Sequence, residues 1–137
     1  MIVGVPKETF PGERRVALVP SAVPALAKAG LEVRVQAGAG QEAGYPDQEY
    51  QEQGAQVVPS RDEAFQAPIV LQVRTLGTNP EQGEDDLARL QSDQIVIGHA
   101  DPLGNPQAAT RYAEAGARLF ALELIPRITR AQSMDVL

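Results

Sequence analysis

The chain has 137 residues, of which 43% are hydrophobic and 22% are charged, a composition typical of one soluble globular domain. Its formal net charge is −6, and its 12 basic residues form no cluster, which argues against a nucleic-acid-binding function. The absence of cysteine excludes disulfides and thiolate metal sites, and one histidine provides no metal-binding constellation. No apolar run approaches the ~18 residues that a membrane-spanning helix requires.

Strand-like and helix-like segments alternate along the chain. Short apolar or alternating segments predict strands at residues 2–5, 31–36, 56–58, 69–73, 94–97 and 118–122. Capping residues and helix-breaking glycines predict helices at residues 22–29, 48–53, 61–66, 84–91 and 106–115, with Ser21, Asp47, Ser60 and Asn105 as the N-caps. Residues 76–86 are polar and rich in turn formers, which predicts the most mobile loop of the chain.

This alternation predicts the fold class. Strands that alternate with helices form a mostly parallel sheet, and the helices cover both of its faces. Several of the predicted strands are almost entirely apolar, as buried parallel strands are. We therefore expect residues 1–137 to form a single three-layer α/β domain with a Rossmann-like layout but without a glycine-rich phosphate loop.

One glycine-rich segment resembles a dinucleotide-binding fingerprint. Gly38, Gly40 and Ala43 follow a predicted strand with the spacing G-x-G-x-x-A. In the fingerprint this segment opens a long helix, whose N-terminus binds the pyrophosphate. Here Gly44 and Pro46 follow at once, so we interpret the segment as a structural turn.

The C-terminal run P-R-I-T-R-A-Q-S-M-D follows the last predicted strand and is dense in hydrogen-bonding groups. Polar loops on rigid scaffolds often carry function. The run closely resembles the nucleotide-contacting loop in the alpha subunit of proton-translocating NAD(P) transhydrogenases. The resemblance implies that Arg127, Gln132 and Asp135 contact the nicotinamide and its ribose and orient the ring for hydride transfer, with Ser133 as a further contact. The competing interpretation is a charged loop that caps a helix.

The N-terminal segment resembles a second group of enzymes as well. The pattern K-E-x-x-x-x-E-x-R-V-A-L-x-P at residues 7–20 resembles the opening of both transhydrogenase alpha subunits and alanine dehydrogenases. In alanine dehydrogenases the arginine that matches Arg15 binds the substrate carboxylate, because a guanidinium forms two parallel hydrogen bonds with it. The resemblance therefore implies a substrate or interface role for Arg15, and the alternative is a solvated charge beside Glu13.

Two further positions separate these relatives. Alanine dehydrogenases carry K-V-K-E-P, with a lysine needed at the substrate carbonyl, where this chain has Gln72, Val73 and Arg74. Arginine stays protonated and cannot shuttle a proton, which argues against amino-acid dehydrogenation. His99 lies just after a predicted strand, could pair with Asp101 and is a candidate acid or base. A structural histidine is the simpler interpretation.

The resemblance implies a complete enzyme larger than this chain. We expect the chain to be part of the NAD(H)-binding component, with NADP(H) bound by a separate subunit or domain and protons moved by a separate membrane part. Its partners would be the rest of the alpha subunit, the beta subunit and a second copy in a homodimer, at the cytoplasmic face of the cell membrane. We expect the 137-residue chain alone to be inactive. The alternatives are an alanine dehydrogenase-like enzyme and a non-catalytic dimerisation or scaffold module.

Overall fold

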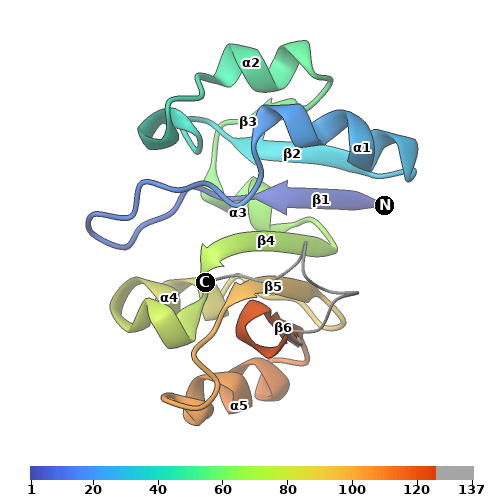
Figure 1. Cartoon of the computed structure of the whole chain (residues 1–137). Helices are drawn as coiled ribbons and strands as arrows, with labels where there is room; N and C mark the ends of the chain where they lie inside the picture. The colour runs from blue at the N-terminus through green and yellow to red at the C-terminus, as the bar shows by residue number, and fades with distance from the viewer. Residues whose placement is uncertain (126–137) are drawn as a thin grey trace.

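The computed structural model describes residues 1–125, which form an open, six-stranded, fully parallel sheet (Figure 1). The strand order is β3-β2-β1-β4-β5-β6, which is the order of doubly wound dinucleotide-binding sheets. The strands are β1 Ile2–Val5, β2 Glu32–Gln36, β3 Gln56–Val58, β4 Ile69–Arg74, β5 Ile95–His99 and β6 Arg118–Ala121. All six predicted strands and their parallel arrangement are thus confirmed.

Helices connect the strands and pack against both faces of the sheet. They are α1 Val23–Lys28, α2 Asp47–Glu52, α3 Arg61–Phe65, α4 Pro80–Leu87 and α5 Pro106–Glu114. Short 3₁₀ turns lie at η1 Pro20–Ala22, η2 Gln41–Ala43, η3 Leu76–Thr78 and η4 Leu122–Leu124. In Figure 1, α1 lies in front of the sheet and α3 lies behind it. None of the helices within the described part of the chain is long and apolar enough to cross a membrane.

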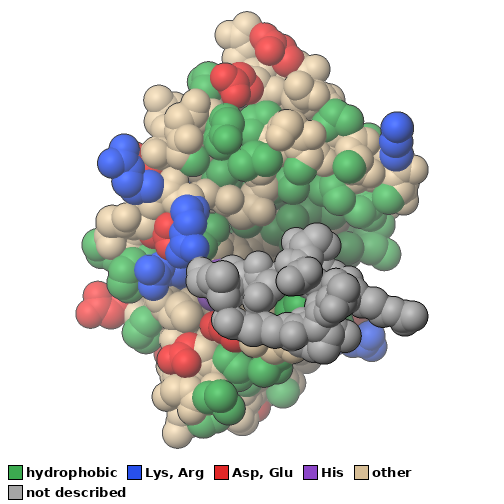
Figure 2. All heavy atoms as spheres, in the orientation of Figure 1, with side chains coloured by type: hydrophobic (Ala, Val, Ile, Leu, Met, Phe, Trp, Pro, Cys, Tyr) green, Lys and Arg blue, Asp and Glu red, His purple; other side chains and the backbone are tan. Residues whose placement is uncertain are grey.

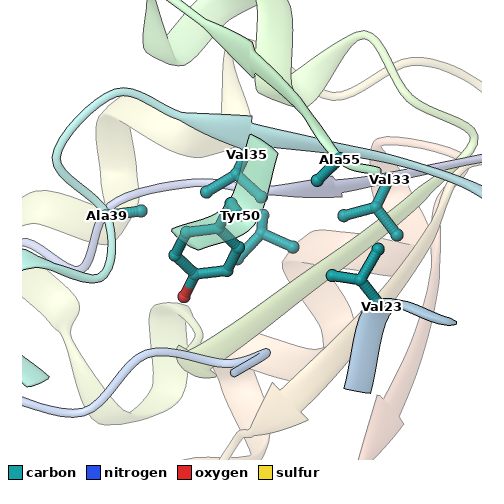
Figure 3. Packing of buried hydrophobic residues seen from close by; sticks show 7 residues of the cluster. Val23, Val33, Val35, Ala39, Tyr50 and Ala55 are labelled. Atoms are coloured by element: carbon teal, nitrogen blue, oxygen red, sulfur yellow. The ribbon is translucent and has the colours of Figure 1, made fainter. Parts of the chain in front are cut away.

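Two hydrophobic clusters fill the spaces between the sheet and its helices. The first cluster contains Val33 and Val35 of β2 together with Val23 of α1 and Tyr50 of α2 (Figure 3). The Tyr50 hydroxyl donates a 2.7 Å hydrogen bond to the Leu18 carbonyl, which satisfies its buried polar atom. This contact ties the segment before α1 to α2.

The second cluster lies on the opposite face. Val70 of β4 and Val96 of β5 pack there against Phe65 of α3 and Tyr112 of α5. Leu71, the residue next to Val70, packs instead against the first cluster. Because successive side chains of a strand point to opposite faces, this alternation shows that helices cover both sides of the sheet. The three-layer prediction is confirmed.

Several predicted boundaries and caps are wrong. The predicted helix at residues 84–91 is α4 at Pro80–Leu87, so residues 76–86 form η3 and most of a helix rather than one long loop. Pro80 at the first helical position fits this earlier start, because proline's fixed φ suits a first turn. Ser21 lies inside η1 rather than capping α1. Ser60 does cap α3, since its hydroxyl accepts a 3.2 Å bond from the Glu63 amide.

Asp47, the predicted N-cap of α2, is the first residue of this helix, and its side chain bonds outside the helix. The Asp47 carboxylate accepts a 2.9 Å bond from the Gly38 amide, nine residues earlier. Gly38 has a φ of +82°, a conformation that favours glycine. The segment then forms only η2 before the six-residue α2. The structural turn predicted at Gly38 is therefore confirmed, and it opens no long helix that could hold a pyrophosphate.

Candidate functional site

A pocket lies at the carboxyl edge of the sheet, where the strand order reverses between β1 and β4. Doubly wound sheets bind their ligands at such a topological switch point. The pocket has a volume of about 310 Å³, and we call it the switch-point pocket. Its walls are formed by Arg15, Val16, Ala17, Leu71, Gln72, Val73, Ile97, His99 and Leu122. Mostly apolar walls with a few polar groups are typical of small-molecule sites.

The loop that follows β1, residues 6–16, forms one side of this pocket and is anchored to β4. The Glu8 carboxylate accepts two 2.9 Å bonds from the backbone amides of Val73 and Arg74. Burial raises the pKa of Glu8 above its usual value, although these amides act in the opposite direction. The Asn79 side chain adds a 2.9 Å bond to the hydroxyl of Thr9. The loop is therefore held at both the end of β4 and the turn beyond it.

Glu13 links the two arginines that the sequence singled out. Its carboxylate accepts bonds of 2.9 and 2.7 Å from Arg15 and a 2.8 Å bond from Arg74. The Glu13 side chain is only 4% exposed, whereas that of Arg15 is 59% exposed. The hydrogen bonds from Arg15 have the largest effect and lower the pKa of Glu13. Burial acts in the opposite direction, but the bond from Arg74 lowers the pKa further, to about 2. Glu13 is therefore ionised at neutral pH and neutralises one of the two positive charges.

Arg74 is held by two further contacts. Its guanidinium lies 4.0 Å from the centre of the Phe10 ring, which is a cation–π distance. It also donates a 3.2 Å bond to the Thr78 carbonyl. A side chain with three partners of this kind is fixed in place, so Arg74 fastens the β1 loop to the turn after β4.

His99 ends β5 on the other side of the pocket. Its Nδ1 lies 3.9 Å from Oε1 of Glu123, whose carboxylate also accepts bonds of 2.7–3.0 Å from the amides of Ala100 and Asp101. Burial would raise the pKa of Glu123, but these amide bonds outweigh it and the pKa lies below its usual value. The prediction that His99 pairs with Asp101 is wrong. His99 lies beside Glu123, and the Asp101 carboxylate accepts a bond from the Gly104 amide.

Gln72 is the buried polar residue of the pocket wall. It is 5% exposed and is one of the residues that line the pocket. The β4–β5 register shifts between Leu71 and Arg74, so the strand is irregular at this position.

The structure thus brings together three of the predicted site residues. Arg15 and His99 line the pocket, and Arg74 is joined to Arg15 through Glu13. Arg127, Gln132, Ser133 and Asp135 lie outside the described residues, so their predicted contacts stay predictions. Sequence reasoning missed the anchoring roles of Glu8, Glu13 and Glu123. Their partners lie at the end of β4 or directly after β5, up to 66 residues away.

Charges gather around this edge although the chain is acidic overall. Figure 2 shows Lys and Arg side chains near the β1 loop, on the left of this view. Within residues 1–125 no three His, Cys, Asp or Glu side chains are arranged to hold a metal ion. Organic ligands with polar substituents are the class that suits a pocket of this composition.

The Glu13 pair leads to a prediction about acid stability. A carboxylate whose folded pKa is about 2 and whose ordinary value is 4.5 stabilises the folded state above pH 4.5, and this contribution is lost as pH falls through 2. We expect Glu13→Gln to lower the free energy of unfolding by about 1–2 kcal/mol at pH 7, a value limited by water screening of Arg15. Urea unfolding at pH 7 and pH 3 should show the difference from wild type shrinking at the lower pH.

The matched control is Glu84→Gln, which removes a carboxylate from the exposed pair with Arg111. Surface pairs contribute little, so this variant should unfold like wild type at both pH values. A Glu13→Gln variant whose deficit is the same at pH 3 as at pH 7 would contradict the assignment of Glu13 as the titrating group.

Known proteins resemble this chain over its whole length. The family described as "Alanine dehydrogenase/PNT, N-terminal domain" matches residues 4–137. NAD(P) transhydrogenase subunit alpha of Cereibacter sphaeroides is 38% identical over 100% of this chain, which spans 25% of that protein. A solved transhydrogenase structure from Sinorhizobium meliloti has a TM-score of 0.89 and 41% identity, covering 98% of this chain and 39% of that one.

A solved L-alanine dehydrogenase is also similar. Its TM-score is 0.83 at 32% identity, covering 95% of this chain and 34% of that one. The chain thus spans between a quarter and two-fifths of the length of these three relatives. Since the family match covers nearly every residue, the chain belongs to the family of alanine dehydrogenase/PNT N-terminal domains.

Proposed function

We propose that this chain is part of the NAD(H)-binding component of an NAD(P) transhydrogenase, an enzyme that passes a hydride between NAD(H) and NADP(H). Transhydrogenases among its relatives are 29–41% identical to this chain, and alanine dehydrogenases are 27–32% identical. The observation that favours a transhydrogenase over an alanine dehydrogenase is the environment of Arg74. Its guanidinium is bound to Glu13, Thr78 and the Phe10 ring, so it replaces a proton-shuttling lysine by a structural cation.

The residues present fit the ring end of a dinucleotide better than its phosphates. The switch-point pocket offers mostly apolar walls, whereas the glycine turn at Gly38 opens no long helix. We therefore propose that this chain forms one wall of the NAD(H) cleft and that the pyrophosphate is bound elsewhere. When bound, the nicotinamide ring supplies or accepts the hydride, and the chain's own part is to orient the ring and exclude water.

In this proposal the C-terminal residues complete the wall. Arg127, Gln132 and Asp135 contact the nicotinamide and its ribose, and Ser133 adds a further polar contact. Their effect is on orientation, because misplacement of reacting atoms by ~1 Å can cost on the order of a hundredfold in rate. The chain alone therefore binds NADH weakly and does not turn over.

The proposed enzyme needs further components. NADP(H) binds to a separate subunit or domain, and a membrane part couples hydride transfer to proton translocation. The remainder of the alpha subunit, the beta subunit and a second copy of the chain are the proposed partners. Through them the chain is held at the cytoplasmic face of the membrane.

The test is an assay of the assembled enzyme with two sets of substrates. We expect reduction of an NADP⁺ analogue by NADH, and no alanine from pyruvate, ammonia and NADH. Glu84→Gln, on the surface away from the pocket, should leave both results unchanged. Formation of alanine at a rate similar to that of a true alanine dehydrogenase would overturn the proposal, and absence of both activities would favour a scaffold role.

A further inference from the structure

One carboxylate fastens the last described segment of the chain to the neighbouring strand. Glu123 lies in η4, directly after β6, and its side chain reaches the turn that follows β5. The amide of Ala100 lies 3.0 Å from both carboxylate oxygens, and the amide of Asp101 donates a 2.7 Å bond to Oε2. Consecutive backbone amides that converge on one point form a binding site for an anion. Glu123 fills this site from 22 residues further along the chain.

The turn that supplies the amides is itself held by hydrogen bonds. Asp101 has a φ of +46°, a left-handed conformation that aspartate adopts more readily than most residues. Its carboxylate accepts a 3.1 Å bond from the Gly104 amide, and its carbonyl accepts a 2.8 Å bond from the Asn105 amide. These two bonds fix the conformation of the turn and therefore the direction of the Asp101 amide.

The end of β5, from which the turn starts, is also fixed. The His99 carbonyl accepts bonds of 2.8–3.0 Å from the amide and hydroxyl of Thr75 and from the hydroxyl of Thr78. The His99 ring lies 3.9 Å from Glu123, which is too long for a hydrogen bond, so the two amides are the groups that hold the carboxylate. Glu123 is thus attached to a rigid part of the sheet.

The place of this anchor in the sequence gives it a role. Glu123 precedes Arg127 by four residues, and Arg127 is the first of the residues proposed to contact the nicotinamide. Four residues span at most ~14 Å when fully extended, so a fixed Glu123 limits the region that Arg127 can reach. Leu122 also holds η4 through its apolar contact with the switch-point pocket. Apolar contacts are not directional, whereas the hydrogen bonds of Glu123 set the direction of the chain.

We propose that Glu123 is a positioning residue: its carboxylate fills the anion site after β5 and sets the point from which the chain enters the proposed nicotinamide loop. The inference rests on the proposed function, because the contacts of that loop with the cofactor belong to it. Glu123 itself does not touch the cofactor. Its removal therefore affects the orientation of the ring more than the strength of cofactor binding.

The first measurement tests the anchor in the ¹⁵N-labelled 137-residue chain. Burial would raise the pKa of Glu123, but its amide bonds outweigh this effect, so the Ala100 amide signal should titrate with a midpoint below 4.5. In Glu123→Gln this transition should disappear. The Gly104 amide, which reports the Asp101 carboxylate, should keep its own transition and serves as the control. An Ala100 signal that titrates identically in both proteins would overturn the inference.

The second measurement is hydride transfer from NADH to an NADP⁺ analogue in the assembled enzyme. We expect Glu123→Ala to lower turnover at least about tenfold and to change the KM for NADH less than about threefold, because misplaced atoms react slowly although cofactor contacts remain. The Glu123 side chain is 32% exposed, so acetate should enter the vacated site and restore part of the turnover, whereas chloride at equal ionic strength should not. Glu84→Ala, which removes the exposed partner of Arg111, should show neither loss nor rescue.

The outcomes distinguish the inference from the proposed function. If Glu123→Ala matches the wild type in turnover and KM, the inference is wrong and the proposed function stands. A loss of turnover that acetate does not restore would also contradict the inference, because the carboxylate would then not be the group that matters. An assembled wild-type enzyme that transfers no hydride would overturn the proposed function, and with it the role given to Glu123.

Discussion

Asp86→Ala is expected to destabilise the chain by about 3–5 kcal/mol, the range for removing one partner of a buried ion pair. Asp86 of α4 and Arg61 of α3 form two 2.7 Å bonds, and their side chains are only 6% and 14% exposed. Arg61 also donates to the Lys7 carbonyl and lies 5.3 Å from the Phe65 ring centre. Without Asp86 a nearly buried guanidinium loses its counter-charge, and α3, α4 and the β1 loop lose their common link.

The measurement is urea unfolding followed by circular dichroism, together with a melting temperature. Stabilities of small domains are about 5–15 kcal/mol, so a loss of this size should lower the melting temperature by roughly 10 °C or more. The matched control is Asp62→Ala, because Asp62 pairs with Arg89 but its side chain is 74% exposed. It should cost less than about 1 kcal/mol. Similar losses for the two variants would show that burial of the Asp86 pair does not govern its contribution.

Gly4→Ala is expected to have a comparably large effect, of about 3 kcal/mol or more. A Cβ at this position of β1 would lie 2.0 Å from the Ala64 carbonyl oxygen and 3.0 Å from the Ala67 Cβ. Neither atom belongs to a flexible side chain, so α3 would have to move away from the sheet. Such a shift would disturb Phe65, a buried residue of the second cluster, and overpacked cores commonly lose 1–3 kcal/mol or somewhat more.

The comparison variant is Gly54→Ala. Gly54 has a φ of +99° and nothing within 4 Å of an added Cβ, so its alanine suffers only backbone strain of about 1–2 kcal/mol. Thermal unfolding of both variants separates the clash from the strain. If Gly4→Ala unfolds no earlier than Gly54→Ala, the close approach of α3 to β1 is not a determinant of stability.

The sequence by itself determined the elements whose signals are local. Alternation of short apolar strands with capped helices identified all six parallel strands, because burial on both faces of a sheet requires nearly continuous apolar runs. The cap at Ser60 and the turn at Gly38 depend on contacts within nine residues, and both were predictable. The helix α4 was misplaced, because the turn-rich residues 76–86 concealed a start at Pro80.

Only the tertiary structure decided the strand order and the partners of the charged groups. Glu8 and Glu13 bind atoms of β4 more than 60 residues away, and nothing in the sequence between them marks these pairs. Parallel strands bring the loops after β1, β4 and β5 to one edge of the sheet, which is why Arg15, Gln72 and His99 share a pocket. The sequence supplied the side chains, and the crossover connections of the sheet determined which of them are in contact. They also placed Glu13 where it accepts hydrogen bonds from both Arg15 and Arg74.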